Sequence, residues 1–270
     1  MQELRHAAIA LLAVVVLATG TARGATTTNF TDQWWIEAES GWGATVLQQW
    51  DTLFIDLFVY GADGKATWFV AAAAQQPDGP AGHVVFTGDL YTATGPYYGA
   101  PFGSAPVAGR KVGTLTFDAG TITTAKLSYS VDGTDVVKNV TRQTWTLQNL
   151  SGSYYGGNVG WQTQCGEDNG KYEEQSYIEV THNADNSFSM KWTDLQNRPL
   201  TFTGVYSQSG HMGQVLVTGV SPAEAGVTIT GNFFEIERSV SGITGRGRLV
   251  ATSGGNPVCV WDGRWGGVLR

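Results

Sequence analysis

The stretch 34–69 most constrains the fold, because it combines the alternation of β-strands with tight turns. Residues 43–49 alternate small or apolar side chains with polar ones, and residues 53–60 are apolar, aromatic and β-branched. A turn at 62–65 leads into another apolar run at 66–71. Three such strands bury too little apolar surface to offset the entropy of ordering them. The stretch therefore predicts a larger all-β body.

The first half of the chain predicts a meander of short strands. Asp63-Gly64 and Asp132-Gly133 are the best hairpin signals, because glycine reaches the positive φ of primed turns. Residues 95–106 are too rich in glycine and proline for a ladder and predict a long loop. The expected strands are 36–39, 43–50, 53–61, 66–73, 82–91, 111–117, 121–131 and 135–147.

The second half repeats this theme. Residues 180–192 mirror 59–68, each with a strand, a turn at Ala-Asp and a strand that carries tryptophan, and 202–206 echoes 86–91. This likeness suggests a duplication. We predict an all-β chain of two consecutive antiparallel meander β-barrels, or barrel-like sandwiches. The first module would span 31–148 and the second 149–270.

The N-terminus reads as a secretory signal peptide over residues 1–24. Arg5 and His6 precede an apolar run at 7–18, and 22–24 forms a small-x-small cleavage site. The run is shorter than the roughly 20 residues of a membrane-spanning helix, and no comparable run follows. We therefore expect an exported bacterial protein, periplasmic or extracellular, without a transmembrane segment. Its formal net charge of −7 argues against nucleic acid as a partner.

Cys165 and Cys259 are the only cysteines, and in an exported chain they predict a disulfide bond. The bond would close a loop of about 95 residues and restrict the unfolded chain by roughly 4–5 kcal/mol in the entropy model. It would join the first strand region of the second half, near Trp161, to the last, near Trp261. First and last strands lie side by side when a meander closes into a barrel or folds as a sandwich.

Motifs for phosphate, metal or nucleophilic-serine chemistry are missing from the sequence. His83, His182 and His211 are isolated, so each is expected to be a surface or turn residue, with a metal ligand or general base as the alternative. The oxygen-rich turns at 167–170 and 185–186 lack the spacing of a calcium loop. We expect no metal and no cofactor.

Glu37 and Glu39 are the most suggestive carboxylates. They would share one face of an extended segment, and burial by Trp34, Trp35 and Trp42 would raise their pKa values into an acid/base range. The alternative is structural: one of them caps a backbone end or pairs with Arg142 from the last strand of the same half.

The aromatic residues form the remaining constellation. Tryptophan serves both as a barrel plug and as a platform for sugar rings or apolar ligands, so core packing and binding are both open readings. In the binding reading the loop 95–109 lids an open end of the first barrel. The expected ligand-binding residues are Trp35, Trp42, Trp68, Tyr97, Tyr98, Phe102, Glu39 and Arg142.

The first half also resembles a β module that recurs in exported proteobacterial proteins. The motifs that carry the resemblance are Trp34-Trp35, 39–43, Gln48-Gln49, Asp51, Tyr60, 63–65 and Trp68. The resemblance covers about 115 residues. Its further matching positions are Gly88, 90–91, 95–96, 112–113, Phe117, Tyr129, Gly133, Lys138 and 142–143. Trp50 stands where the module usually has glycine before the aspartate, which predicts a bulge or an exposed tryptophan there. The resemblance implies export and a β fold, and carries no activity.

By fold analogy alone, an eight-stranded meander with a glycine-tryptophan motif is similar to the lipocalin and avidin architecture. We predict an exported, non-enzymatic protein that binds a small apolar or glycan ligand, or a partner surface, through an aromatic barrel mouth. One alternative is a hydrolase or lyase that uses Glu37 or Glu39. Another is a structural or adhesive envelope component. The sequence does not define an oligomeric state.

Overall fold

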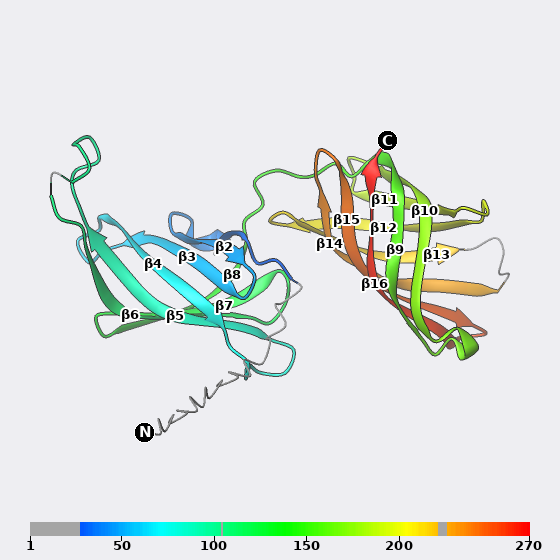
Figure 1. Ribbon diagram of the computed structural model, residues 1–270, viewed down its shortest axis with the longest axis horizontal. Helices are drawn as coiled ribbons and strands as arrows, with labels where there is room; N and C mark the ends of the chain where they lie inside the picture. The colour runs from blue at the N-terminus through cyan, green and yellow to red at the C-terminus, as the bar shows by residue number, and fades with distance from the viewer. Residues whose placement is uncertain (1–27, 104, 221–225) are drawn as a thin grey trace, which may run out of the picture.

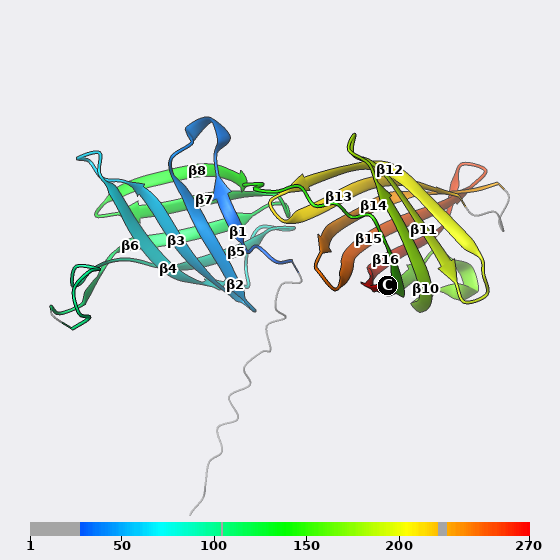
Figure 2. The same cartoon turned by 90° about the horizontal axis from the view of Figure 1, so that it is seen from above.

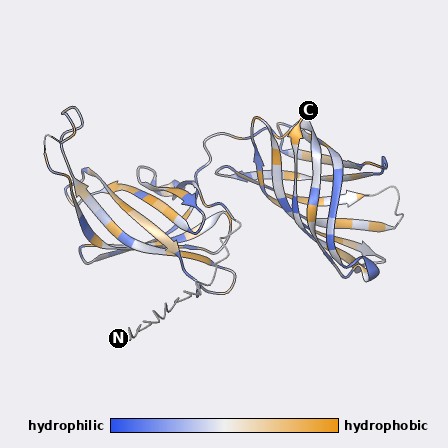
Figure 3. Ribbon diagram, in the orientation of Figure 1, coloured by the Kyte–Doolittle hydropathy of each residue, from blue (hydrophilic) through white to orange (hydrophobic). Residues whose placement is uncertain are grey.

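The computed structural model describes residues 28–103, 105–220 and 226–270, and the predicted signal peptide lies outside these ranges. Within them the chain forms two consecutive closed barrels of eight antiparallel strands each (Figure 1). Hydrophobic and hydrophilic residues alternate along the strands of both barrels (Figure 3). This period of two places one set of side chains inside each barrel and the other set outside. The predicted all-β, two-barrel fold is confirmed.

The first barrel follows the chain as an up-and-down meander. The short strand β1 pairs with β2 on one side and closes the barrel through Trp34 and Trp35, which pair with Arg142 and Thr141 of β8. Its strands are β1 (Asp32–Trp35), β2 (Gly43–Gln49), β3 (Thr52–Tyr60), β4 (Ala66–Gln75), β5 (Val84–Thr94), β6 (Ala108–Ala119), β7 (Thr124–Val131) and β8 (Thr134–Arg142).

The second barrel repeats the meander with longer strands. Ten residue pairs close it between its first and last strands, from Val260 with Thr163 to Leu269 with Tyr154. Its strands are β9 (Gly152–Thr163), β10 (Gly170–His182), β11 (Ser187–Asp194), β12 (Pro199–Ser209), β13 (Met212–Val220), β14 (Val227–Arg238), β15 (Gly242–Ser253) and β16 (Asn256–Leu269).

The strand predicted at 36–39 is wrong. The first strand is β1, and Glu37–Glu39 forms a 3-10 turn, η1, instead. The earlier register is favoured because it directs Trp34 into the core, where the ring is fully buried against Phe117. A tryptophan side chain gains far more from burial than either glutamate does. The last strand of this barrel also ends at Arg142, earlier than the predicted residue 147.

The turns follow the expected chemistry. Asp132 (φ 48°) and Gly133 (φ 86°) form the two-residue connection between β7 and β8, as a primed turn requires. Gly64 (φ 75°) occupies the tight turn between β3 and β4. Trp50 also takes a positive φ, 56°, and its side chain is 83% exposed.

Each barrel is plugged at one end by the residues that precede its first strand. Trp34 donates its indole N–H to the carbonyl of Phe30 at 3.0 Å, and both residues are buried. Tyr154 donates its hydroxyl to the carbonyl of Leu150 at 2.8 Å, and these two are buried as well. The same bond to the fourth residue upstream therefore recurs at the same place in both barrels, which supports the suspected duplication.

The two plugged ends face one another. His211, between β12 and β13, reaches Asp32 of β1, and Gly210 donates its backbone N–H to Thr144 of the connecting segment. Thr28 donates to Glu235 across the same junction. The opposite ends of the two barrels point away from the junction, to the two poles of the molecule (Figures 1 and 2).

The predicted disulfide bond is confirmed. Cys165 follows β9, Cys259 lies in β16, and the two are 94 positions apart. Because β9 and β16 are the strands that close the second barrel, the bond fastens this seam at the end away from the junction.

Candidate functional site

A cavity of about 390 Å³ opens at the outer end of the second barrel, beside the disulfide bond. Residues of seven strands line it, together with Asp168 from the 3-10 turn η2 (Gly166–Asp168) that follows β9. The lining residues that carry its chemistry are Asn158, Asp168, Tyr172, Glu174, Trp192 and Trp261.

Glycines place Trp261 against the barrel wall. A Cβ atom added to Gly263, Gly247 or Gly160 would come within 2.7, 2.9 and 2.8 Å of the Trp261 indole. The ring therefore occupies space that side chains at these three inward positions would fill. A wall without side chains lets a large ring lie close to it and leaves the lumen beside the ring open.

Trp192 joins Trp261 from the other side of the lumen. Their ring centroids are 6.2 Å apart with an interplanar angle of 79°, an edge-to-face arrangement. Trp192 also packs edge-on against Phe202 at 5.1 Å, and Trp265 lies 6.3 Å from it. An aromatic layer thus separates the cavity from the packed core of the second barrel.

Several buried polar atoms at this cavity have no hydrogen-bond partner. They are Oδ1 of Asn158 and the indole nitrogens of Trp192 and Trp261, and each of these side chains is at least nine-tenths buried. A buried polar group without a partner costs about 1–3 kcal/mol. Native proteins keep few such groups, so the atoms at this cavity need a hydrogen-bond partner that the chain itself does not supply.

Tyr172 and Glu174 form the charged edge of the cavity. Burial raises the pKa of Tyr172 to about 12, helped by the charge of Glu174 and by a hydrogen bond to it. The phenol therefore stays protonated at neutral pH and donates to the Glu174 carboxylate. Arg198, whose charge acts on Tyr172 in the opposite direction, is paired with Asp194 at 2.5 Å.

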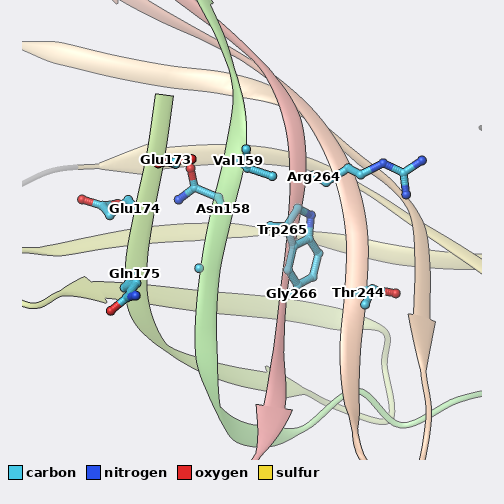
Figure 4. A pocket seen from close by; sticks show the side chains of 10 residues that line it. Asn158, Val159, Glu173, Glu174, Gln175, Thr244, Arg264, Trp265 and Gly266 are labelled. Carbon is cyan, nitrogen blue, oxygen red and sulfur yellow. The ribbon is translucent and has the colours of Figure 1, made fainter. Parts of the chain in front are cut away.

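A second depression lies on the outer face of the same wall, across β10, β9, β16 and β15 (Figure 4). Gln175, Gly157, Gly266 and Thr244 pair in a row across these strands, and the two glycines leave its floor without side chains. This groove, of about 670 Å³, is open to solvent along its length. It offers a ligand less enclosure than the cavity inside the barrel mouth.

The structure separates the aromatic residues expected at the first barrel mouth. Trp35 follows the inward-facing Trp34 and so lies on the outer face of the barrel. Trp68, 48% exposed, lies on the same outer face and pairs with the exposed Phe58. Trp42 alone of the three expected tryptophans packs against the core at the mouth.

Glu39 is paired at that mouth, but with Lys138. The Lys138 ammonium lies 2.6 Å from the carboxylate, and Trp42 donates its indole N–H to the same oxygen at 2.9 Å. The hydrogen bond to Lys138 is the largest influence on the pKa of Glu39, which it lowers. The polar groups of the first mouth therefore satisfy one another. Glu37 is exposed on the same turn, so the expected shared face of an extended segment is wrong.

The long loop between β5 and β6 carries Tyr97, Tyr98 and Phe102, which are 65%, 94% and 88% exposed. The rings of Tyr97 and Tyr98 contact each other at 4.4 Å between centroids. The loop extends from the mouth end of the first barrel (Figure 1), and its three aromatic rings are exposed to solvent.

Arg142 lies at the opposite end of the first barrel from Glu39. Its fully buried side chain donates to the carbonyls of Ile122 and Asn29, each at 2.7 Å, and to Asp32 at 3.0 Å. The guanidinium also stacks over Trp34, 4.8 Å from the ring centroid. Arg142 therefore ties down the plug of the first barrel, and the structure does not bring it together with the other expected binding residues.

No family model matches this chain, and no match was found among the curated proteins or the solved structures. The described part of the chain contains no helix that could span a membrane. Within the same residues, no group of histidine, cysteine and carboxylate side chains is arranged to hold a metal ion. The fold and the cavity define a class of protein: a β protein of two barrels, one of which has a mouth lined by aromatic rings and by buried polar atoms without hydrogen-bond partners.

The residues of the second mouth were missed in the sequence because no contiguous motif joins them. Asn158, Trp192 and Trp261 come from three strands that only barrel closure brings together. A weak signal was present: glycines recur at spacings of one to three residues in β9, β15 and β16, at positions 156, 157, 160, 245, 247, 263, 266 and 267.

Proposed function

We propose that this protein is an exported, non-enzymatic binding protein that takes one small ring-containing ligand into the mouth of its second barrel. The observation that carries the proposal is the cavity in which Asn158 and Trp192 hold buried polar atoms without partners beside the Trp261 ring. The cavity volume lies in the range of small-molecule sites, which combine aromatic walls with a few polar groups. The disulfide bond at this mouth fits an oxidising compartment outside the cytoplasm.

The second mouth is favoured as the binding site because the first mouth has fewer free polar groups and less open space for a ligand. Glu39, Lys138 and Trp42 already bond to one another there, and the interior below them is filled by the core residues around Trp34 and Phe117. We therefore place the binding site for the apolar or glycan ligand expected from the sequence in the second barrel, and not in the first.

The alternatives have less support from the geometry. A hydrolase or lyase would need Glu37 or Glu39 free at a cavity, whereas Glu39 is held by Lys138 and Glu37 is exposed on a turn. A purely structural or adhesive component would be expected to fill both barrels with its own side chains, and the second barrel retains a cavity at its mouth.

The test is calorimetric titration of the full chain with three phenols that carry a trimethylammonium, tert-butyl or sulfonate group in the para position. At least one of them should bind, and Trp261→Ala should abolish that binding. Trp68→Ala, on the outer face of the first barrel, is the matched control and should bind as the parent does. Trp261→Phe keeps an aromatic ring in place, so it separates loss of the site from loss of the fold.

Failure of all three phenols to bind, or equal binding by the parent and a folded Trp261→Ala variant, would refute a small-ligand site in this mouth.

A further inference from the structure

We infer that the ligand of the second mouth is an organic cation, an amine or quaternary ammonium group on an apolar body. This inference rests on the proposed function, and it concerns the charge of the ligand. The observations that carry it are the ring faces, the carboxylates and the orientation of the polar atoms around the cavity.

Aromatic rings and carboxylates dominate the lining. Trp192, Trp261 and Tyr172 contribute three rings, and Glu174 and Asp168 contribute two carboxylates. The described residues that line this cavity include neither lysine nor arginine. Ring faces are electronegative and attract cations, and the attraction grows when the cation is desolvated. The lining is therefore complementary to positive charge and repels an anion.

The polar atoms of the cavity also favour a positively charged ligand. The unpartnered Oδ1 of Asn158 is an acceptor, and the Glu174 carboxylate already accepts one hydrogen bond from Tyr172 and has capacity for more. The indole nitrogen of Trp261 lies within 2.8 Å of where a Cβ of Gly160 would sit, so it faces the wall and not the lumen. Apart from the unpartnered indole N–H of Trp192, the cavity thus offers acceptors and ring faces to a ligand in the lumen.

The pairing of β9 with β10 explains how these groups come together. Asn158 and Glu174 are direct partners across the two strands and point to the same side. Tyr172 precedes Glu174 by two positions, so it shares the inward face. One strand pair thus supplies the acceptors, and the tryptophans of β11 and β16 supply the opposing rings.

The neutral and cationic phenols of the titration test this inference directly, because trimethylammonium and tert-butyl groups have nearly the same shape and differ in charge. We expect the trimethylammonium phenol to bind at least tenfold more tightly than the tert-butyl phenol, and the sulfonate to show no binding. Glu174→Gln should weaken the cation about tenfold and leave the neutral phenol unchanged. Glu173→Gln, on the outward face of the same strand, is the matched control.

The outcomes separate the two proposals. If the tert-butyl phenol or the sulfonate binds as tightly as the cation, and Trp261→Ala abolishes that binding, the charge assignment is wrong and the binding function stands. If the cation prefers the site but Glu174→Gln and Glu173→Gln weaken it equally, the charge of the whole protein and not this carboxylate provides the preference, and the assignment is again wrong. If none of the three phenols binds, both proposals fail.

Discussion

Asp32 in the first barrel and His211 in the second meet across the junction, with the Oδ2 atom of Asp32 2.8 Å from the Nδ1 atom of His211. The backbone N–H of His211 donates to the same oxygen at 3.1 Å, and Arg142 donates to it from the other side. A single carboxylate oxygen therefore joins the closing strand of one barrel to a hairpin of the other.

This contact predicts a pH-dependent stability. Burial alone would lower the pKa of His211, but its hydrogen bonds to Asp32 and Glu237 outweigh burial and raise the pKa to about 9. Because the folded pKa exceeds the ordinary histidine value of about 6.5, the protonated imidazole stabilises the fold fully below pH 6.5, and this contribution is lost as the pH rises through about 9. Thermal unfolding followed from pH 6 to 10 should show this decline.

His211→Gln should remove most of that decline, whereas Arg110→Ala, which breaks an exposed ion pair with Asp132 in the first barrel, should retain it. An unchanged pH profile in His211→Gln would show that another group is responsible.

The buried position of Arg142 predicts a large loss of stability on truncation. Arg142→Ala should lower the free energy of unfolding by about 3–5 kcal/mol, because it leaves buried carbonyls and the Asp32 carboxylate without their donor. Arg110→Ala should cost about 0–1 kcal/mol, as exposed pairs do. Urea unfolding of the two variants makes the comparison, and similar losses in both would contradict the anchoring role of Arg142.

The disulfide bond should stabilise the second barrel selectively. Replacing Cys165 and Cys259 by serine should lower the free energy of unfolding by about 2–5 kcal/mol, since the unfolded chain gains the freedom of a long loop. Hydrogen exchange resolved by residue should show faster opening in β9 and β16 and no change in β2 and β3. Equal acceleration in both barrels would mean that the bond supports the whole molecule and not one seam.

Because glycines pack directly against the Trp261 ring, adding one methyl group at Gly263 should lower the stability of the protein and change the environment of the ring. Gly263→Ala would place its Cβ 2.3 Å from the carbonyl oxygen of Val159 and 2.7 Å from the indole, so it should cost about 1–3 kcal/mol and shift the emission of Trp261. Gly109→Ala is the control, because a Cβ there meets nothing within 4 Å and the backbone has no positive φ. Unaltered stability and emission in Gly263→Ala would show that the ring does not depend on this wall.

Local patterns in the sequence were sufficient for most strands of the first barrel, several turns and the disulfide bond. Alternation along 43–49 and the turn at Asp132-Gly133 act over a few residues, and the cysteine pair needed only the compartment and the closing of a meander. The start of the first strand was misplaced because the burial of Trp34 against Phe117, far along the chain, decides its register.

The candidate site was less predictable, because its members meet only after closure. The aromatic residues in 34–69 drew attention to the first barrel, where Trp35 and Trp68 turned out to face outward. Arg142 reads as a partner for a nearby glutamate, yet its partners are carbonyls and Asp32 at the far end of the barrel. Which end of a barrel a side chain reaches depends on strand register, and composition carries no information on that.

The junction joins the plugged ends, so each mouth opens toward its own pole of the molecule (Figure 2). The site proposed beside Trp192 and the exposed rings of Tyr97 and Tyr98 therefore lie at opposite ends of the molecule. A contact made by the mouth of the first barrel would therefore leave the mouth of the second barrel open to solvent.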